Sequence, residues 1–234
     1  MIRALLLFLL LLPLPLQAKA IIGDTSIRHI DIDSYFTGTN LMIFGAREEA
    51  GDVIVVVRGP ERNFVIRRKK RRLGVWVNVE QHAMLNIPEF YAVASSRRLE
   101  DIPAQPLLDS LEIGQLHLPY SLQAQEFIEA FRRLRAKQML YPEDIEISFM
   151  GETLFKTVIR FPEKIPRGTY TAEFYLINDG QLVGMQSIPI QVSKVGMDAA
   201  IYDLAHSYPY AYGILSIGLA LAAGWFAAWV FRKQ

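Results

Sequence analysis

An uncharged apolar run near the C-terminus constrains this chain more than any other feature. Residues 208–231 read YPYAYGILSIGLALAAGWFAAWVF and include no Asp, Glu, Lys, Arg or His. At about 1.5 Å of rise per residue, a helix of this length covers about 36 Å, which is enough to cross a hydrocarbon core of about 30 Å. Tyr and Trp side chains near its two ends suit the two membrane interfaces. The run therefore predicts one transmembrane helix, followed by a short tail at residues 232–234.

The N-terminal residues 1–20 have the pattern of a secretory signal peptide. Arg3 precedes an apolar stretch, and Ala18-Lys19-Ala20 forms a small-x-small cleavage pattern. An uncleaved first anchor is the alternative, but about 13 apolar residues interrupted by two prolines span a bilayer poorly. We expect cleavage after Ala20.

The distribution of charge around the apolar run predicts its orientation. Arg232 and Lys233 follow the run, whereas residues 196–207 before it contain two aspartates and no Lys or Arg. The positive-inside rule then places the C-terminus in the cytoplasm. The sequence predicts a single-pass membrane protein with an exported N-terminal domain and a cytoplasmic C-terminus.

The composition of the exported part excludes several classes of function. The chain has no cysteine, so it has no disulfide, thiolate nucleophile or thiolate metal site. Without the four basic residues of the terminal segments, the chain has 21 basic and 24 acidic residues. The exported part therefore has no overall positive charge that would attract nucleic acid. Nucleophile-elbow, phosphate-loop, dinucleotide and zinc motifs are all absent from the sequence. We expect no enzyme activity, no cofactor and no metal site.

Two blocks of strand-like sequence flank a helical segment. In residues 21–102 and again in 144–196, short runs with a period of two alternate with Gly, Pro and Asn-Asp-Gly turns. Between them, residues 103–143 contain a helical period over 121–141 and a weaker one over 106–111. The pattern predicts a mainly β, immunoglobulin-like β-sandwich with a helical insertion, a juxtamembrane segment at 197–207 and the C-terminal transmembrane helix.

Three details of this architecture stay open to test. Two small β domains joined by a helical hairpin are the alternative to one sandwich. Asn178-Asp179-Gly180 is expected to be a hairpin tip. Trp76, on a predicted strand over 75–79, is expected in the core.

Several strings in the mature chain carry a resemblance to a known family. They include FTGTNLMIFGA at 36–46, DVIVVVRGP at 52–60, VIRRKKRRLGVWVN at 65–78 and KVGMDAAIYDLAH at 194–206. The chain resembles the alphaproteobacterial putative transmembrane protein family, whose members have a signal peptide, a β-rich periplasmic domain and one C-terminal span. The resemblance implies the bacterial inner (plasma) membrane as the location, with the N-terminal domain in the periplasm. The resemblance implies a transporter partner, a sulfite-exporter-type permease, and it implies no catalytic residue.

The densest charge in the chain is the run of six basic residues from Arg67 to Arg72. Alternate side chains of a strand face opposite sides, so Arg67, Lys69 and Arg71 would share one face. Because neither face can be buried unpaired, we expect an edge strand or an exposed hairpin. The plain interpretation is a solvated edge that resists aggregation. The functional one is that these three residues and Arg58 contact anionic lipid headgroups, an acidic partner or a small oxyanion.

The predicted transmembrane helix carries a stripe of small residues. Ala220, Gly224 and Ala228 are spaced by four and share one helix face. Such stripes allow helices to approach closely, so the stripe predicts packing against a membrane-protein partner or against a second copy, although Ala and Gly are also common in spans.

Two classes of function fit these features. The first is a non-enzymatic accessory or interaction subunit of a membrane transporter, held in the lipid bilayer. The second is a membrane-tethered ectodomain that binds a small oxyanion or acts as an enzyme.

Overall fold

The computed structural model describes residues 20–120 and 125–232. The signal peptide, the expected start of the long helix at 121–124 and the last two residues of the tail lie outside the described residues. The strands are β1 (Ile21–Thr25), β2 (His29–Ile32), β3 (Gly38–Arg47), β4 (Asp52–Arg58), β5 (Glu61–Arg72), β6 (Val75–Pro88), β7 (Tyr91–Ser95), β8 (Ile145–Glu146), β9 (Ser148–Met150), β10 (Leu154–Pro162), β11 (Gly168–Asn178) and β12 (Gln181–Lys194). The helices are η1 (Leu99–Asp101), α2 (Gln105–Ser110), α3 (Gln125–Lys137), α4 (Met197–Ser207) and α5 (Pro209–Phe231).

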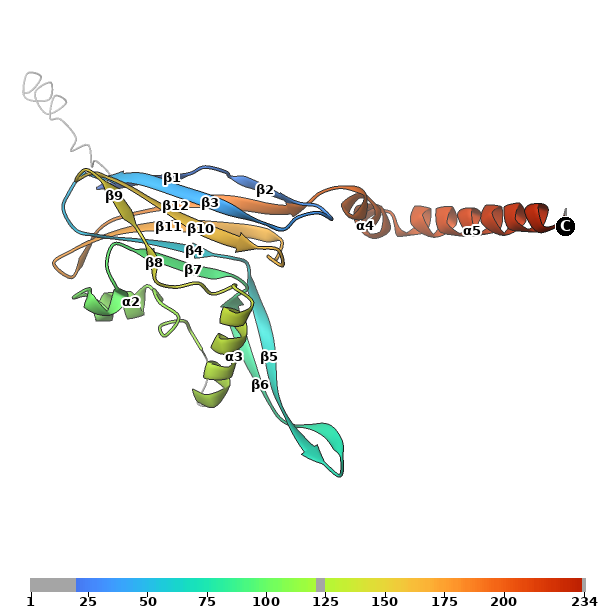
Figure 1. Cartoon of the computed structure of the whole chain (residues 1–234), viewed down its shortest axis with the longest axis horizontal. Helices are drawn as coiled ribbons and strands as arrows, with labels where there is room; N and C mark the ends of the chain where they lie inside the picture. Colours follow the sequence, from blue (N-terminus) through green and yellow to red (C-terminus); the bar gives the residue numbers. More distant parts are fainter. Residues whose placement is uncertain (1–19, 121–124, 233–234) are drawn as a thin grey trace, which may run out of the picture.

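Ten of the described strands form two sheets that pack face to face (Figure 1). The first sheet, here called sheet A, has the order β1-β3-β10-β9, and the second, sheet B, has the order β2-β12-β11-β4-β7-β8. The two sequence blocks interleave in both sheets, because β3 pairs with β10 and β4 pairs with β11. The blocks therefore form one folding unit, and the alternative of two small β domains is wrong.

Aromatic side chains fill the space between the sheets. The Phe155 ring of sheet A lies 6.4 Å from the Phe174 ring of sheet B. Gly23 of β1 lies so close to Phe174 that a Cβ there would come within 2.2 Å of the ring. Such close approach and fully buried aromatic rings are typical of a well-packed two-layer core.

The helical insertion adds a third layer below sheet B (Figure 1). Residues 53–57 of β4, the VIVVV run, are all fully buried, as expected for a strand whose two faces are both covered. The hydroxyl of Tyr91 ties the insertion to the sheet, since it donates to the carbonyl of Glu112 and accepts from the N–H of Gly114 at 2.7 Å. The weak helical pattern over 106–111 corresponds to α2.

The turn between β11 and β12 has the conformation that its sequence predicts. Asp179 and Gly180 both have positive φ, 48° and 77°. A two-residue hairpin loop of this kind needs two left-handed residues, and Asp-Gly provides them at low cost. The expected hairpin tip is confirmed.

The C-terminal helices extend away from the sandwich (Figure 1). Among the described residues, Pro209–Phe231 is the one helix that is long and apolar enough to cross a membrane, and none of it is buried. The juxtamembrane segment forms the separate helix α4, which begins after Gly196. The predicted mainly β fold with one C-terminal apolar helix is confirmed.

Candidate functional site

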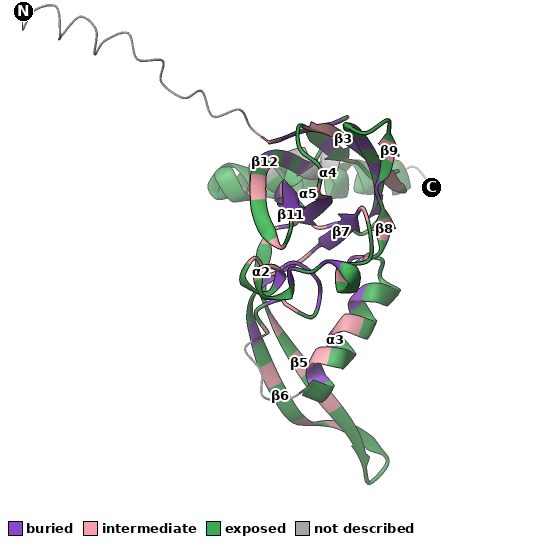
Figure 2. Ribbon diagram, turned by 90° about the vertical axis from the view of Figure 1, so that its left-hand side faces the viewer, coloured by how far each residue is buried: buried purple, intermediate pink, exposed green. Residues whose placement is uncertain are grey.

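The basic run lies on a long hairpin that stands outside the sandwich. Strands β5 and β6 pair only with each other and project away from both sheets (Figures 1 and 2). Most of the hairpin is exposed. Of the two alternatives expected from its charge, an edge strand or an exposed hairpin, the structure shows the second. The expectation that these two strands belong to the sandwich is wrong. The run from Arg67 to Arg72 puts charged side chains on both faces of the outer half of the hairpin, whereas Met84 and Ile87 at its base are buried.

Helix α3 packs against the base of this hairpin. The Phe131 ring lies 5.3 Å from Phe64 of β5, and Phe127 lies 4.3 Å from the ring of His82 on β6. The Arg68 guanidinium covers Phe127 at 4.9 Å and forms ion pairs with Glu80 and with Glu126 of the helix. The helix thus fixes the base of the hairpin and neutralises one of the six consecutive cations.

A buried arginine completes the contact between α3 and the hairpin. Arg135 is 9% exposed, and its guanidinium lies 4.3 Å from the Phe64 ring and 5.0 Å from the Phe131 ring. Burial lowers the pKa of Arg135, and the neighbouring Tyr141 opposes that shift. The aromatic faces attract the cation where water cannot reach it. Sequence reasoning assigned Arg135 no role, because helical periodicity does not show which cation is buried.

Beyond α3, the hairpin ends in a segment that we call the basic tip, residues 69–78. The strand register sets Arg67, Lys69 and Arg71 opposite Gln81, Asn78 and Trp76. The register shifts between Arg68 and Lys69, so the common face of the three cations stays a prediction; their cross-strand neighbours carry no negative charge. Trp76 is 66% exposed, so its expected place in the core is wrong.

Arg58 lies apart from the basic tip and is engaged within the fold. Its Nε donates to Glu173 at 2.8 Å, and its terminal nitrogen donates to the carbonyls of Leu111 and Glu112 at 2.8 and 3.1 Å. Its guanidinium lies 5.2 Å from the Tyr91 ring. With these partners, Arg58 joins sheet B to the insertion at the end of β4, and the structure does not bring it together with the other predicted contact residues.

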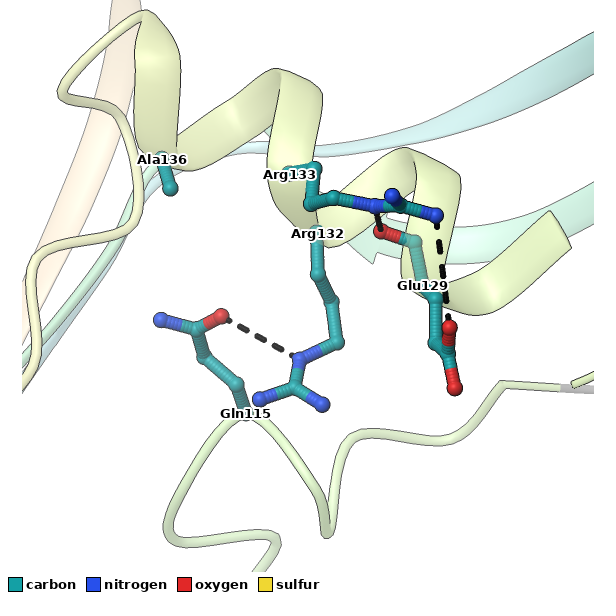
Figure 3. Close-up of a pocket in the computed structure, with 5 residues that line it drawn as sticks. All are labelled: Gln115, Glu129, Arg132, Arg133 and Ala136. Carbon is teal, nitrogen blue, oxygen red and sulfur yellow. Dashed lines mark hydrogen bonds and ion pairs between the residues drawn. The ribbon is translucent and has the colours of Figure 1, made fainter. Parts of the chain in front are cut away.

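A shallow groove between α3 and the loop at Gln115 contains two further arginines (Figure 3). Arg132 points across the groove to the amide oxygen of Gln115 at 3.4 Å, while Arg133 turns along the helix towards Glu129. The carboxyl of Glu143 accepts from the N–H of Gln115, and burial raises the pKa of Glu143. Carboxylates beside the arginines make this groove a poor site for an anion.

The outer face of sheet A exposes a group of large apolar side chains, here called the apolar face, with Lys156 among them opposite Phe44. Each of its six members is 42–53% exposed. They are Ile22, Met42, Phe44, Met150, Leu154 and Val158. Cross-strand pairing brings them together, for example Val158 beside Met42 and Leu154 beside Met150. This face cannot be recognised from the sequence, because β3 and β10 carry apolar residues on both alternating sides.

The small-residue stripe lies on α5. Ala220, Gly224 and Ala228 follow one another at helical spacing of four along an exposed helix, and no atom lies within 4 Å of where a Cβ of Gly224 would be. The stripe is free to receive another helix.

His29 and Asp31 project from β2 and contact each other at 2.8 Å. Both are more than half exposed, while Ile30 between them is buried. Within the described part of the chain, no cluster of three His, Asp or Glu could hold a metal ion.

Comparison with known proteins shows the family of this chain. The family model described as "Putative transmembrane protein (Alph_Pro_TM)" matches residues 20–233. The chain belongs to this family. The resemblance predicted from its sequence strings is thus confirmed, and it agrees with the apolar helix α5. No curated protein matches the chain.

Solved structures add little to this assignment. One chain comes from a structure described as "Structural basis of T cell specificity and activation by the bacterial superantigen toxic shock syndrome toxin-1". It is 7% identical, with a TM-score of 0.27, and the match covers 75% of this chain and 99% of that one. A likeness this low supports no argument about fold or function.

Proposed function

We propose that this membrane protein is a non-enzymatic accessory or interaction subunit of a membrane transporter. The apolar face of sheet A is the observation that carries the proposal. Large exposed apolar patches on a folded domain are typical of protein–protein contact sites. The family resemblance suggests a sulfite-exporter-type permease as the partner.

The arrangement of the chain supports a partner in the same membrane. In Figure 1 the strands of the sandwich run roughly along the axis of α5, so the apolar face points sideways from that axis. A neighbouring membrane protein can therefore contact this face and the stripe of α5 together. The ectodomain then works in the periplasm and the C-terminus lies in the cytoplasm, as the flanking charges favour.

Affinity purification in mild detergent tests the proposal. The wild-type chain should recover a stoichiometric membrane protein, and the variant with Met42→Gln and Phe44→Gln should lose most of it. A matched control carries Leu182→Gln and Met185→Gln, two apolar residues on β12 that are 38% and 48% exposed. Recovery that is equal for both variants, or absent for the wild type, would contradict the proposal.

The second class of function makes the opposite predictions. A tethered oxyanion-binding ectodomain should bind sulfate or sulfite in calorimetry of the detergent-solubilised chain and should recover no partner. We expect no heat of binding, because Arg58, Arg97 and Arg98 outside the tip already pair with carboxylates. Saturable sulfate binding would favour the second class.

The orientation can be tested separately, because the chain has no cysteine of its own. Lys164→Cys places one thiol on an exposed loop of the ectodomain. A membrane-impermeant maleimide should label it in cells with a permeabilised outer membrane and an intact inner membrane. Labelling only after lysis would place the ectodomain in the cytoplasm.

A further inference from the structure

We propose that the basic tip of the β5–β6 hairpin binds the anionic surface of the bilayer in which α5 is anchored, with Leu73 and Trp76 entering the headgroup region. This inference rests on α5 as a membrane span and does not depend on a transporter partner. Three independent features of residues 69–78 support it.

The first feature is uncompensated positive charge. Lys69, Lys70, Arg71 and Arg72 are all exposed, and the tip contains no acidic residue. The ion pairs found among the described residues involve none of these four side chains. In contrast, Arg68 at the base has two carboxylate partners. The charge that α3 leaves unneutralised is thus concentrated at the far end of the hairpin.

The second feature is exposed apolar surface on a strained turn. Leu73 and Gly74 connect the two strands with φ of 50° and 84°, so this is a loop that favours Asn-Gly or Asp-Gly. Leu73 is fully exposed, and Val75 and Trp76 beside it are 64% and 66% exposed. The β11–β12 turn of the same chain has Asp at the equivalent position. A leucine here is unfavourable in water both for its backbone and for its side chain, and insertion into an interface compensates for the second of these.

The third feature is the place where the hairpin leaves the sandwich. Pro60, just before β5, packs beside Gly168, where a Cβ would lie 3.0 Å from the proline ring. Gly168 pairs with Val192, four residues before Gly196 and the start of α4. The hairpin therefore begins at the end of the sandwich nearest α5, and Figure 1 shows the hairpin slanting towards that end.

Cations and an exposed Trp together match an anionic bilayer surface. Lys and Arg are attracted by the headgroup charge, and the amphipathic indole ring prefers the headgroup level. An acidic protein could also attract the cations. We favour the bilayer as the binding surface, because α5 places a bilayer beside this end of the sandwich in every copy of the chain.

Fluorescence of Trp76 in the full-length chain tests the proposal. The chain has three tryptophans, so Trp225→Phe and Trp229→Phe leave Trp76 as the only one. The protein is placed in nanodiscs of phosphatidylcholine, alone or mixed with phosphatidylglycerol. With phosphatidylglycerol, we expect a blue-shifted emission that brominated acyl chains quench and that added salt reverses. With phosphatidylcholine alone, we expect the emission of an exposed indole.

Charge-matched variants make the test specific. Lys69→Gln with Lys70→Gln should lower the ratio of docked to free tip about 30-fold, since each cation near an anionic surface contributes about fivefold. The control removes two exposed cations from sheet A by Lys156→Gln and Arg160→Gln and should leave the Trp76 signal unchanged. Circular dichroism checks that each variant is folded.

Several results would overturn the proposal. The first is a Trp76 emission that is the same with and without phosphatidylglycerol. The second is a lipid response that the tip variant and the sheet A control lose equally. The third is a blue shift that requires an added membrane extract and does not occur with phosphatidylglycerol. The last of these would assign the tip to an acidic protein partner.

Discussion

Replacing Glu173 with glutamine should destabilise the ectodomain by breaking the ion pair at the root of the hairpin. Arg58 is the last residue of β4, and its Nε donates to Glu173 on the adjacent strand β11. The hydroxyl of Tyr175 donates to the same carboxyl oxygen at 3.0 Å. The amide introduced by Glu173→Gln would keep an oxygen that can accept these bonds, but it would leave the Arg58 charge without a counter-charge.

The size of the effect follows from the burial of the pair. The two side chains are only 19% and 16% exposed. Breaking a buried pair costs about 3–5 kcal/mol, and an exposed pair contributes about 0–1 kcal/mol. Because the pair is nearer the buried limit and the carbonyls of the insertion still accept from Arg58, we expect a loss of about 2–3 kcal/mol in the free energy of unfolding.

Urea unfolding of the detergent-solubilised chain, followed by circular dichroism, measures this loss. Glu100→Gln is the matched control, since Glu100 pairs with Arg98 at a site where both side chains are at least 70% exposed. A double-mutant cycle with Arg58→Met isolates the coupling between Arg58 and Glu173. If Glu173→Gln changed the stability no more than Glu100→Gln does, or if the coupling were near zero, the interpretation that Arg58 stabilises the fold through its pair with Glu173 would be refuted.

Two further substitutions test the pH dependence and the packing of the fold. Burial raises the pKa of Glu143, so the folded chain holds this proton more tightly than the unfolded chain does, and the resulting stability is lost as the pH rises from about 4.3 through the folded pKa. Glu143→Gln, which keeps an acceptor for the N–H of Gln115, should therefore raise Tm at neutral pH and have little effect near pH 4; an equal effect at both pH values would contradict this. Gly23→Ala should lower the stability by about 1–3 kcal/mol, because its Cβ would overlap the buried Phe174 ring. Gly218→Ala, with no atom within 4 Å, should have no such effect in the same thermal unfolding assay.

The sequence allowed the local features of the fold to be predicted where one physical signal dominates. The uncharged run predicts α5 because few other structures bury or accommodate so many apolar residues in succession. The Asp179-Gly180 turn and the exposure of the basic run follow equally directly from backbone and solvation preferences. Each of these predictions depends only on residues that are close in the sequence.

Features that depend on distant partners could not be predicted in this way. A period of two is the same for a sandwich strand and for a free hairpin, so the pattern did not show that β5 and β6 leave the sheets. Whether Trp76 is buried or exposed depends on that choice. Arg58 and Glu173 are 115 positions apart, and no local pattern connects them. The apolar face of sheet A likewise arises only when four strands are placed side by side.

The two proposed contact surfaces lie on opposite sides of the ectodomain, and this separation has a testable consequence. Figures 1 and 2 both show sheet A and the hairpin at opposite ends of the layered body, with sheet B and the insertion between them. One copy of the chain can therefore contact a neighbouring protein through the apolar face while its basic tip contacts lipid. Variants at sites this far apart with no shared partners should act independently. Lys69→Gln with Lys70→Gln should leave recovery of the membrane partner unchanged, and Met42→Gln with Phe44→Gln should leave the lipid response of Trp76 unchanged. If either variant abolished both signals while remaining folded, the two surfaces would have to belong to one binding event.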